Sequence, residues 1–304
     1  MKYNPKKFNI EYIAKFESST KENQIKVWIA QPLSFGCQRI DSFSIFPKPK
    51  NLYKDTQGNK ILYFCFKDFK NFEIKMNIKT TLWKKKINLK ENNLSINNKL
   101  FDRYLKSEEF LKQTPEIKKI TYEITKGDES DLDKIKSIFN FIVYNFKYCY
   151  PVENRGVEKL NLKNLKGDCG EYSSLFVTMC RILKIPAKNN TGFVISPTYN
   201  KIIEHGWASA YLKLCDWIDF DTQYASTEKN KMENYFGQRS DYRITFTNGF
   251  NIPLKPSIPK TFKLDFWNNT GLPLKNNSAQ TLQPIIFASK NNLKFKNSIK
   301  IKKP

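Results

Sequence analysis

The first third of the chain alternates between apolar and polar residues in the manner of β-strands. Residues 25–29, 61–66 and 72–78 carry this two-residue period, which places apolar side chains on one face of a sheet. Residues 55–59, with the sequence DTQGN, separate two such runs and are typical of a hairpin turn. We therefore predict an N-terminal antiparallel β-domain that ends in the Lys- and Asn-rich segment 84–99.

Beyond that segment, apolar residues recur every three or four positions, as on one face of an α-helix. Thr114 followed by Pro115 is a typical helix start, with proline at the first helical position. Ser130 opens a second predicted helix, whose apolar stripe consists of Ile135, Ile138, Phe139, Ile142 and Phe146. A third helix is predicted after Asp168, with apolar positions at Tyr172, Leu175, Phe176, Met179, Cys180 and Leu183.

Strand patterns return after the third helix, at residues 192–195, 207–214 and 217–220, and we expect the helix to lie across the sheet that they form. Residues 223–251 are polar and predict a surface loop. Within this loop, Arg239 and Arg243 are candidates for contact with a substrate carboxylate, or else belong to the solvated surface or to structural ion pairs.

The predicted fold class is α+β, in three consecutive parts. An N-terminal β-domain spans residues 1–97, a core with a helix packed on an antiparallel sheet spans residues 98–255, and a short β-rich extension spans residues 256–304. The extension is expected to contain strands at 261–266 and 284–288, where apolar and polar residues alternate.

Composition favours a globular protein. The chain has 304 residues, of which 40% are hydrophobic, enough for packed cores. Residues 1–8 lack the continuous apolar region of a secretory signal, and no apolar run approaches the length of a membrane span. We therefore expect no membrane span and a cytoplasmic location.

The net charge of +23 would attract nucleic acids or anionic surfaces without sequence specificity. Lysine dominates over arginine, is spread along the chain and forms no arginine-rich block. This pattern favours a lysine-rich solvated surface, and no specific nucleic-acid partner is expected.

The chain contains six cysteines and a single histidine, with no CxxC pair, which argues against a zinc site and against a disulfide framework. No metal and no cofactor are expected. Cys65 and Cys180 lie in apolar patterns and are predicted to be core residues, whereas Cys169 follows the predicted helix cap.

Cys169 occupies a position where a sulfur can become reactive. With Asp168 as the N-cap, Cys169 falls in the first helical turn, where free N–H groups and the helix dipole stabilise a thiolate. A nucleophilic thiol also needs a base and a group that orients it. The only histidine is His205, and Asp221 follows 16 residues later, with Asp219 as the alternative carboxylate because the two-residue period puts both on one strand face.

Taken together, these residues resemble the transglutaminase-like superfamily of papain-type cysteine enzymes. Two positions differ from the residue that the family often has, Gly206 in place of alanine and Thr222 in place of proline. The resemblance runs through residues 167–172, 183–188, Gly192, residues 205–207, Tyr211 and residues 217–222.

The resemblance implies a papain-like core and acyl transfer at an amide, from a peptide bond or a glutamine side chain, through a thioester. It makes Cys169 the nucleophile, His205 the general base and acid, and Asp221 the orienting carboxylate, with a protein or peptide as substrate. Hydrolysis is expected over crosslinking.

Two further points remain open from the sequence. Tyr148 lies about 20 residues before the cysteine, where the family often lines its cleft, so Tyr148 is a candidate for stabilising the oxyanion or a core residue. The alternative to an enzyme is a catalytically silent binding or assembly protein that acts through its β-domains.

Overall fold

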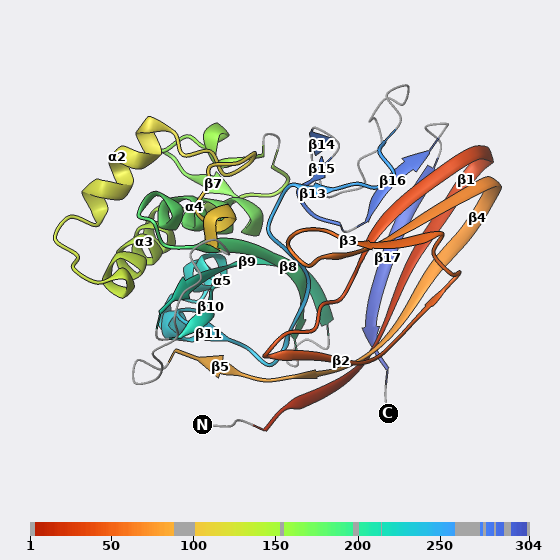
Figure 1. The fold of residues 1–304 in the computed structure, drawn as a ribbon, viewed down its shortest axis with the longest axis horizontal. Helices are drawn as coiled ribbons and strands as arrows, with labels where there is room; N and C mark the ends of the chain where they lie inside the picture. Colours follow the sequence, from red (N-terminus) through yellow and green to blue (C-terminus); the bar gives the residue numbers. More distant parts are fainter. Residues whose placement is uncertain are drawn as a thin grey trace. The chain divides into compact units, whose positions relative to one another are not determined.

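The chain divides into two compact units in a computed structural model (Figure 1). The β unit comprises residues 1–83, 192–204 and 241–304, and the helical unit comprises residues 84–191 and 205–240. The structure describes residues 4–87, 101–152, 155–196, 201–213, 215–258, 274–275, 278–282, 284–288 and 293–302. Helices and antiparallel strands are both present, which confirms the predicted α+β class.

Six strands of the described chain form the main sheet of the β unit, and all their pairings are antiparallel. Its path runs β16-β1-β4-β2, with β17 also paired to β1 and β3 also paired to β4. The strands are β1 (Lys6–Gln31), β2 (Gln38–Phe46), β3 (Asn51–Lys54), β4 (Lys60–Leu82), β16 (Ile285–Ala288) and β17 (Leu293–Ile301).

The alternating pattern explains this sheet. On β1, Tyr12 and Ala14 point into the core and lie opposite Met76 and Ile74 of β4, so apolar side chains meet across the strand pair. The predicted hairpin turn is confirmed between β3 and β4, where the Asp55 carboxylate accepts hydrogen bonds from two backbone N–H groups of the turn.

Shorter strands complete the β unit. They are β12 (Arg243–Asn248), β13 (Ile252–Pro253), β14 (Leu274–Lys275) and β15 (Ser278–Ala279). The prediction of a polar loop over residues 223–251 is wrong, because β12 is a buried strand with Ile244 and Phe246 in the core. The alternation of these apolar residues with threonines is the signal that was missed.

The predicted strand near residue 285 is confirmed as β16, and the one at 261–266 lies outside the described residues. Both β16 and β17 pair with β1 of the first sheet. Of the predicted linker, residues 84–87 are described, and the division into 1–97, 98–255 and 256–304 remains a prediction.

The helical unit holds four α-helices among its described residues, and the three predicted helices are confirmed. The helices are α2 (Pro115–Ile124), α3 (Asp131–Asn145), α4 (Cys169–Ile182) and α5 (Thr222–Thr227). Short 3-10 turns are η1 (Asp102–Tyr104), η2 (Val157–Lys159) and η3 (Lys229–Asn234). Side chains of Thr114, Ser130 and Asp168 accept backbone N–H groups at the starts of α2, α3 and α4, as their residue types predict.

The strands of this unit include β10 (Asp216–Phe220), which pairs with β9 (Lys201–Leu212), and β9 in turn neighbours β8 (Ala187–Ser196). The division of the chain falls within β8 and β9. Two-residue strands pair β5 (Lys85–Lys86) with β11 (Gln238–Arg239), and β6 (Lys147–Tyr148) with β7 (Lys166–Gly167).

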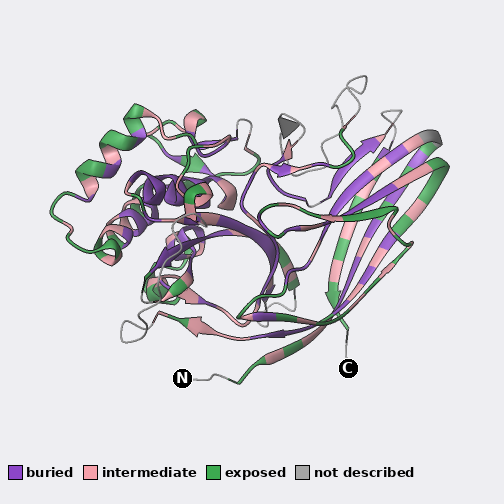
Figure 2. Ribbon diagram, in the orientation of Figure 1, coloured by how far each residue is buried: buried purple, intermediate pink, exposed green. Residues whose placement is uncertain are grey.

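The most deeply buried element of the helical unit is α4. Every residue from Glu171 to Ile182 is buried, as the purple ribbon of α4 indicates (Figure 2). The Phe176 ring stacks on Phe220 of β10 at 5.1 Å, and Arg181 donates hydrogen bonds to the carbonyl of Ala187 and the carboxylate of Glu108. Helix α4 is therefore the core around which the unit packs.

No helix of the described ranges combines the length and the apolar character needed to cross a membrane.

Replacing Gly192 tests the close approach of β8 and β12. A Cβ atom on Gly192 would lie 1.9 Å from the backbone oxygen of Ile244, so Gly192→Ala must separate the strands and should lower the free energy of unfolding by about 1–3 kcal/mol. Gly36→Ala is the control, because nothing lies within 4 Å of a Cβ there. Urea denaturation of both variants measures the effect, and equal midpoints would contradict this account.

Candidate active site

Cys169 is the first residue of α4, as predicted. Its sulfur lies against the backbone of β9, where an added Cβ on Gly206 would be 3.9 Å from Sγ. The backbone of Gly206 also hydrogen-bonds the sulfur. Gly206 directly follows His205, so the cysteine and the histidine occupy the same neighbourhood.

His205 is buried on β9, with a side chain that is 3% exposed. Its Nε2 lies 2.7 Å from Oδ2 of Asp221, and its ring stacks on Tyr224 with centroids 4.3 Å apart and planes within 9°. The carboxylate and the aromatic ring together fix the orientation of the imidazole, and they leave Nδ1 as the second nitrogen.

Asp221 is the N-cap of α5, where its Oδ1 accepts the backbone N–H of Tyr224 at 3.0 Å. The interpretation that Asp219 and Asp221 share one strand face is wrong, since β10 ends at Phe220. The Asp219 carboxylate instead accepts hydrogen bonds from three donors, Trp207, Ser209 and Arg239. Of the two aspartates, Asp221 is thus the partner of His205.

Arg239, one of the two arginines considered for substrate contact, is buried and forms an ion pair with Asp219 at 3.0 Å. Arg243 is likewise buried, at 3% exposure. Neither guanidinium lies on the protein surface, so the structural alternative holds for Arg239.

The environment of Cys169 does not favour a free thiolate. Burial, followed by the charge of Asp168, raises the pKa of the Cys169 thiol, and the hydrogen bond from Gly206 opposes this rise. The prediction that the helix start lowers this pKa is therefore wrong, because desolvation and a neighbouring carboxylate outweigh the helix dipole.

Tyr148 lies on β6, opposite Gly167 of β7. Its side chain is 55% exposed, so the alternative of core packing is wrong. Partial burial of its hydroxyl, followed by the charge of Cys169, raises the pKa of Tyr148, which places the hydroxyl within electrostatic range of the sulfur.

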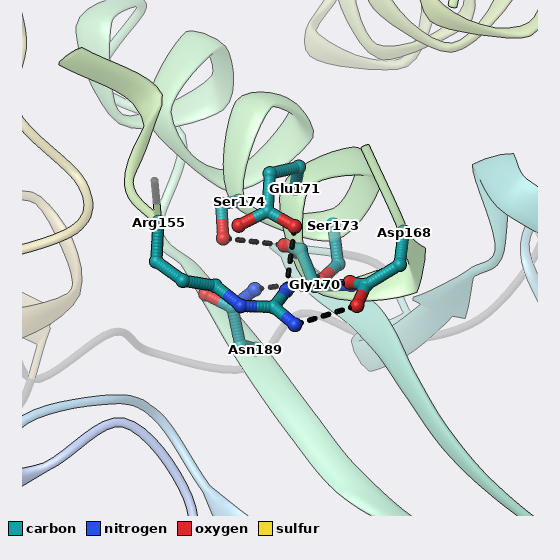
Figure 3. A network of polar contacts seen from close by, with 7 residues as sticks. All are labelled: Arg155, Asp168, Gly170, Glu171, Ser173, Ser174 and Asn189. Atoms are coloured by element: carbon teal, nitrogen blue, oxygen red, sulfur yellow. Dashed lines mark hydrogen bonds and ion pairs between the residues drawn. The ribbon is translucent and has the colours of Figure 1, made fainter. Parts of the chain in front are cut away.

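A buried ion-pair network surrounds the start of α4, and sequence reasoning missed its central residue, Arg155. The guanidinium donates to both carboxylate oxygens of Asp168, at 2.8 and 2.7 Å, and to Oε2 of Glu171 at 2.7 Å. Figure 3 shows the guanidinium lying between the two carboxylates. The side chains of Arg155 and Glu171 are 4% and 0% exposed.

Glu171 differs from Asp168 in its ionisation. Burial raises the pKa of Glu171 to about 8, with Arg155 opposing the shift and Asp168 adding to it. Near neutral pH the network therefore contains one cation, Arg155, one anion, Asp168, and one neutral carboxylic acid, so its net charge is close to zero.

Both glycines beside Cys169 are explained by this network. A Cβ on Gly167 would lie 2.6 Å from Cβ of Glu171, and a Cβ on Gly170 would lie 3.1 Å from Oδ1 of Asp168 and 3.2 Å from Nη1 of Arg155. Glycine leaves the space that the buried side chains occupy.

None of the six cysteines, all of which lie in the described part of the chain, forms a disulfide. Among the residues that the structure describes, no group of three or more His, Cys, Asp and Glu side chains is arranged to hold a metal ion.

Part of the chain, including the residues of this site, matches a known family model. Residues 118–222 match the model of the Transglutaminase-like superfamily, a range that includes Cys169, His205 and Asp221. A search of curated protein sequences gave no match.

Among solved structures, the chain is similar to a candidate cysteine protease from Cytophaga hutchinsonii. The two are 16% identical, with a TM-score of 0.61 over 98% of this chain and 92% of that chain. The periplasmic domain of TgpA from Pseudomonas aeruginosa is 13% identical, with a TM-score of 0.42 over 72% of this chain and 76% of that chain. The similarity to the Cytophaga hutchinsonii protein shows a shared fold.

Glu171 gives the site a pH-dependent contribution to stability. Between its ordinary pKa of 4.5 and about 8, the unfolded chain releases a proton that the folded chain retains. The free energy of unfolding of the wild type, relative to Glu171→Gln, should therefore fall as the pH rises through this window, by at most about 1.4 kcal/mol per pH unit. Urea denaturation of both proteins from pH 4.5 to pH 8.5 measures it, and a constant difference would contradict the assignment of a neutral Glu171.

Gly206→Ala and Gly167→Ala should differ in their effect on stability. At Gly206 an added Cβ meets atoms no closer than 3.7 Å, so Gly206→Ala should fold normally and keep the reactivity of Cys169 towards iodoacetamide. Gly167→Ala forces Glu171 to move and should lower the free energy of unfolding by about 1–3 kcal/mol. Thermal unfolding and alkylation rates compare them, and similar effects of both variants would refute the packing described for Gly167.

Proposed function

We propose, from the match of residues 118–222 to the transglutaminase-like superfamily model, that the protein is a cysteine enzyme that transfers an acyl group from an amide. Cys169 is the nucleophile, His205 the general base and acid, and Asp221 the carboxylate that orients the imidazole. The amide belongs to a peptide bond or to a glutamine side chain.

One observation carries this proposal. Nε2 of His205 is 2.7 Å from Asp221 while the next residue, Gly206, contacts the sulfur of Cys169. Because Asp221 contacts Nε2, the other ring nitrogen, Nδ1, is available to accept the thiol proton. This gives the order carboxylate, imidazole and thiol that nucleophilic catalysis by cysteine requires.

In the proposed reaction the thiol proton passes to His205 as the sulfur attacks the carbonyl carbon, forming a C–S bond. The C–N bond then breaks while His205 returns the proton to the departing nitrogen, which leaves as an amine or ammonia. Water, deprotonated by His205, attacks the thioester, and cleavage of the C–S bond releases a carboxylic acid and restores the thiol.

The tetrahedral intermediate carries a negative oxygen that needs hydrogen-bond donors. The backbone N–H of Cys169, at the start of α4, is one candidate donor. The hydroxyl of Tyr148 is the other candidate donor, because Tyr148 interacts electrostatically with Cys169 and lies on β6, which pairs with β7 just before α4.

Water is the favoured acceptor of the acyl group. Tyr148, the candidate donor to the oxyanion, has 55% of its side chain exposed to solvent. This exposure supports hydrolysis over transfer to an amine. A protein or peptide substrate and a cytoplasmic location remain predictions.

A second candidate, a catalytically silent binding or assembly protein, is favoured by the ionisation of the thiol. Burial and the charge of Asp168 raise the pKa of Cys169, and a neutral thiol is unreactive unless His205 accepts its proton.

Alkylation followed by peptide mapping, together with peptide turnover, separates the two candidates. Cys169→Ala should lower turnover of glutamine-containing peptides by at least about a thousandfold, because the nucleophile is lost, without lowering the melting temperature. Turnover is followed as ammonia release and as new peptide termini. Cys149→Ala is the matched control, since Cys149 is an exposed free thiol, and it should retain full turnover.

If iodoacetamide modifies Cys169 no faster than the buried Cys180 and no peptide is turned over, the enzyme proposal fails and the silent protein is supported.

A further inference from the structure

We propose that Arg155 is a positioning residue that keeps Cys169 reactive by neutralising Asp168, the carboxylate that starts α4. The inference deepens the proposed function, because it concerns the same nucleophile. It concerns how the thiol ionises, which can be measured without any substrate.

Asp168 caps α4, but its negative charge also disfavours ionisation of the neighbouring thiol. Its Oδ1 accepts the N–H of Gly170 at 2.8 Å and so caps α4. The same carboxylate directly precedes Cys169, and after burial its charge is the strongest influence that raises the pKa of the thiol. A helix cap at this position therefore disfavours the thiolate that acyl transfer needs.

Arg155 compensates the negative charge of Asp168 through two hydrogen bonds. Two of its nitrogens face the two oxygens of Asp168 at 2.8 and 2.7 Å, a bidentate arrangement that holds the carboxylate in one orientation. Oδ1 of Asp168 thus serves both the cap and the guanidinium, as Figure 3 shows. The first turn of α4, which begins with Cys169, is fixed by the same contacts.

The cation also acts on the sulfur itself. Burial lowers the pKa of Arg155, but its hydrogen bond to Asp168 and its interactions with Glu171, Asp168 and Cys169 raise it above its ordinary value. The interaction between Arg155 and a Cys169 thiolate is mutual, so the guanidinium stabilises the thiolate.

Glu171 completes the network without adding a charge. Its pKa of about 8 keeps it neutral near pH 7, so Arg155 is available to compensate Asp168. The titratable and charged groups around Cys169 are Asp168 and Glu171 at the start of α4, Arg155 before η2, Tyr148 on β6, His205 on β9 and Asp221 at the start of α5.

The test compares the pH dependence of Cys169 alkylation by iodoacetamide in four proteins, followed by peptide mass spectrometry. The wild type sets the reference midpoint. Arg155→Met leaves Asp168 uncompensated and should raise the midpoint by about one pH unit or more, with roughly tenfold slower alkylation at a fixed pH below it.

Two variants distinguish charge from structure. Arg155→Lys keeps the cation and should stay within about half a unit of the wild type. The double variant Arg155→Met with Asp168→Asn removes both charges while asparagine still caps the helix, so its midpoint should return to that of the wild type. A purely structural role for Arg155 would leave the double variant as perturbed as the single one.

The inference is overturned if the midpoint of folded Arg155→Met equals that of the wild type, or if the double variant remains shifted upward. If Arg155→Met fails to fold, the double variant and Arg155→Lys still test the inference. An upward shift of the alkylation midpoint in both variants would exclude compensation of Asp168 by Arg155. Peptide turnover is assayed separately, so shifted midpoints without any turnover would refute the proposed function while supporting the role of Arg155.

Discussion

Complete burial of α4 is the constraint on which the helical unit depends. From Glu171 to Ile182 the helix contacts protein on all sides, so a charge near either end must be compensated within the protein, at a cost of several kcal/mol if it is not. Arg181 near the C-terminal end is paired with Glu108, and Arg155 is paired with Asp168 and Glu171 at the N-terminal end. Two guanidinium groups thus allow a polar helix start to lie in an apolar interior with Cys169 at its tip.

Local features of this arrangement could be predicted from the sequence. The period of apolar residues and the capping residues Thr114, Ser130 and Asp168 determine α2, α3 and α4, because both signals act over a few residues. The choice between Asp219 and Asp221 could not come from strand periodicity, since the strand ends before Asp221. The relevant signal is that Asp221 caps a helix, which frees it from the strand and turns it to His205.

Non-local features could not be predicted in this way. Arg155 lies 13 residues before Asp168 and 16 before Glu171, with no periodic pattern between them, and the pairing of β16 and β17 with β1 joins opposite ends of the chain. The indication available in the sequence was indirect. Glu171 lies in the first turn of a helix with a regular apolar face, and a carboxyl group in such a position requires a buried partner.

The raised pKa of the Cys169 thiol is compatible with nucleophilic chemistry because the thiol does not ionise alone. Arg155 is paired with Asp168, and Glu171 is neutral near pH 7, so the network at the start of α4 carries a net charge close to zero. Ionisation of the thiol then depends on His205 and Asp221. Asp221 opposes a thiolate, yet it stabilises the imidazolium that forms when the thiol proton moves to His205. Proton transfer creates a pair of opposite charges in a buried site, so the ionisation that matters belongs to the cysteine and histidine together, and burial that penalises an isolated thiolate strengthens the attraction within that pair.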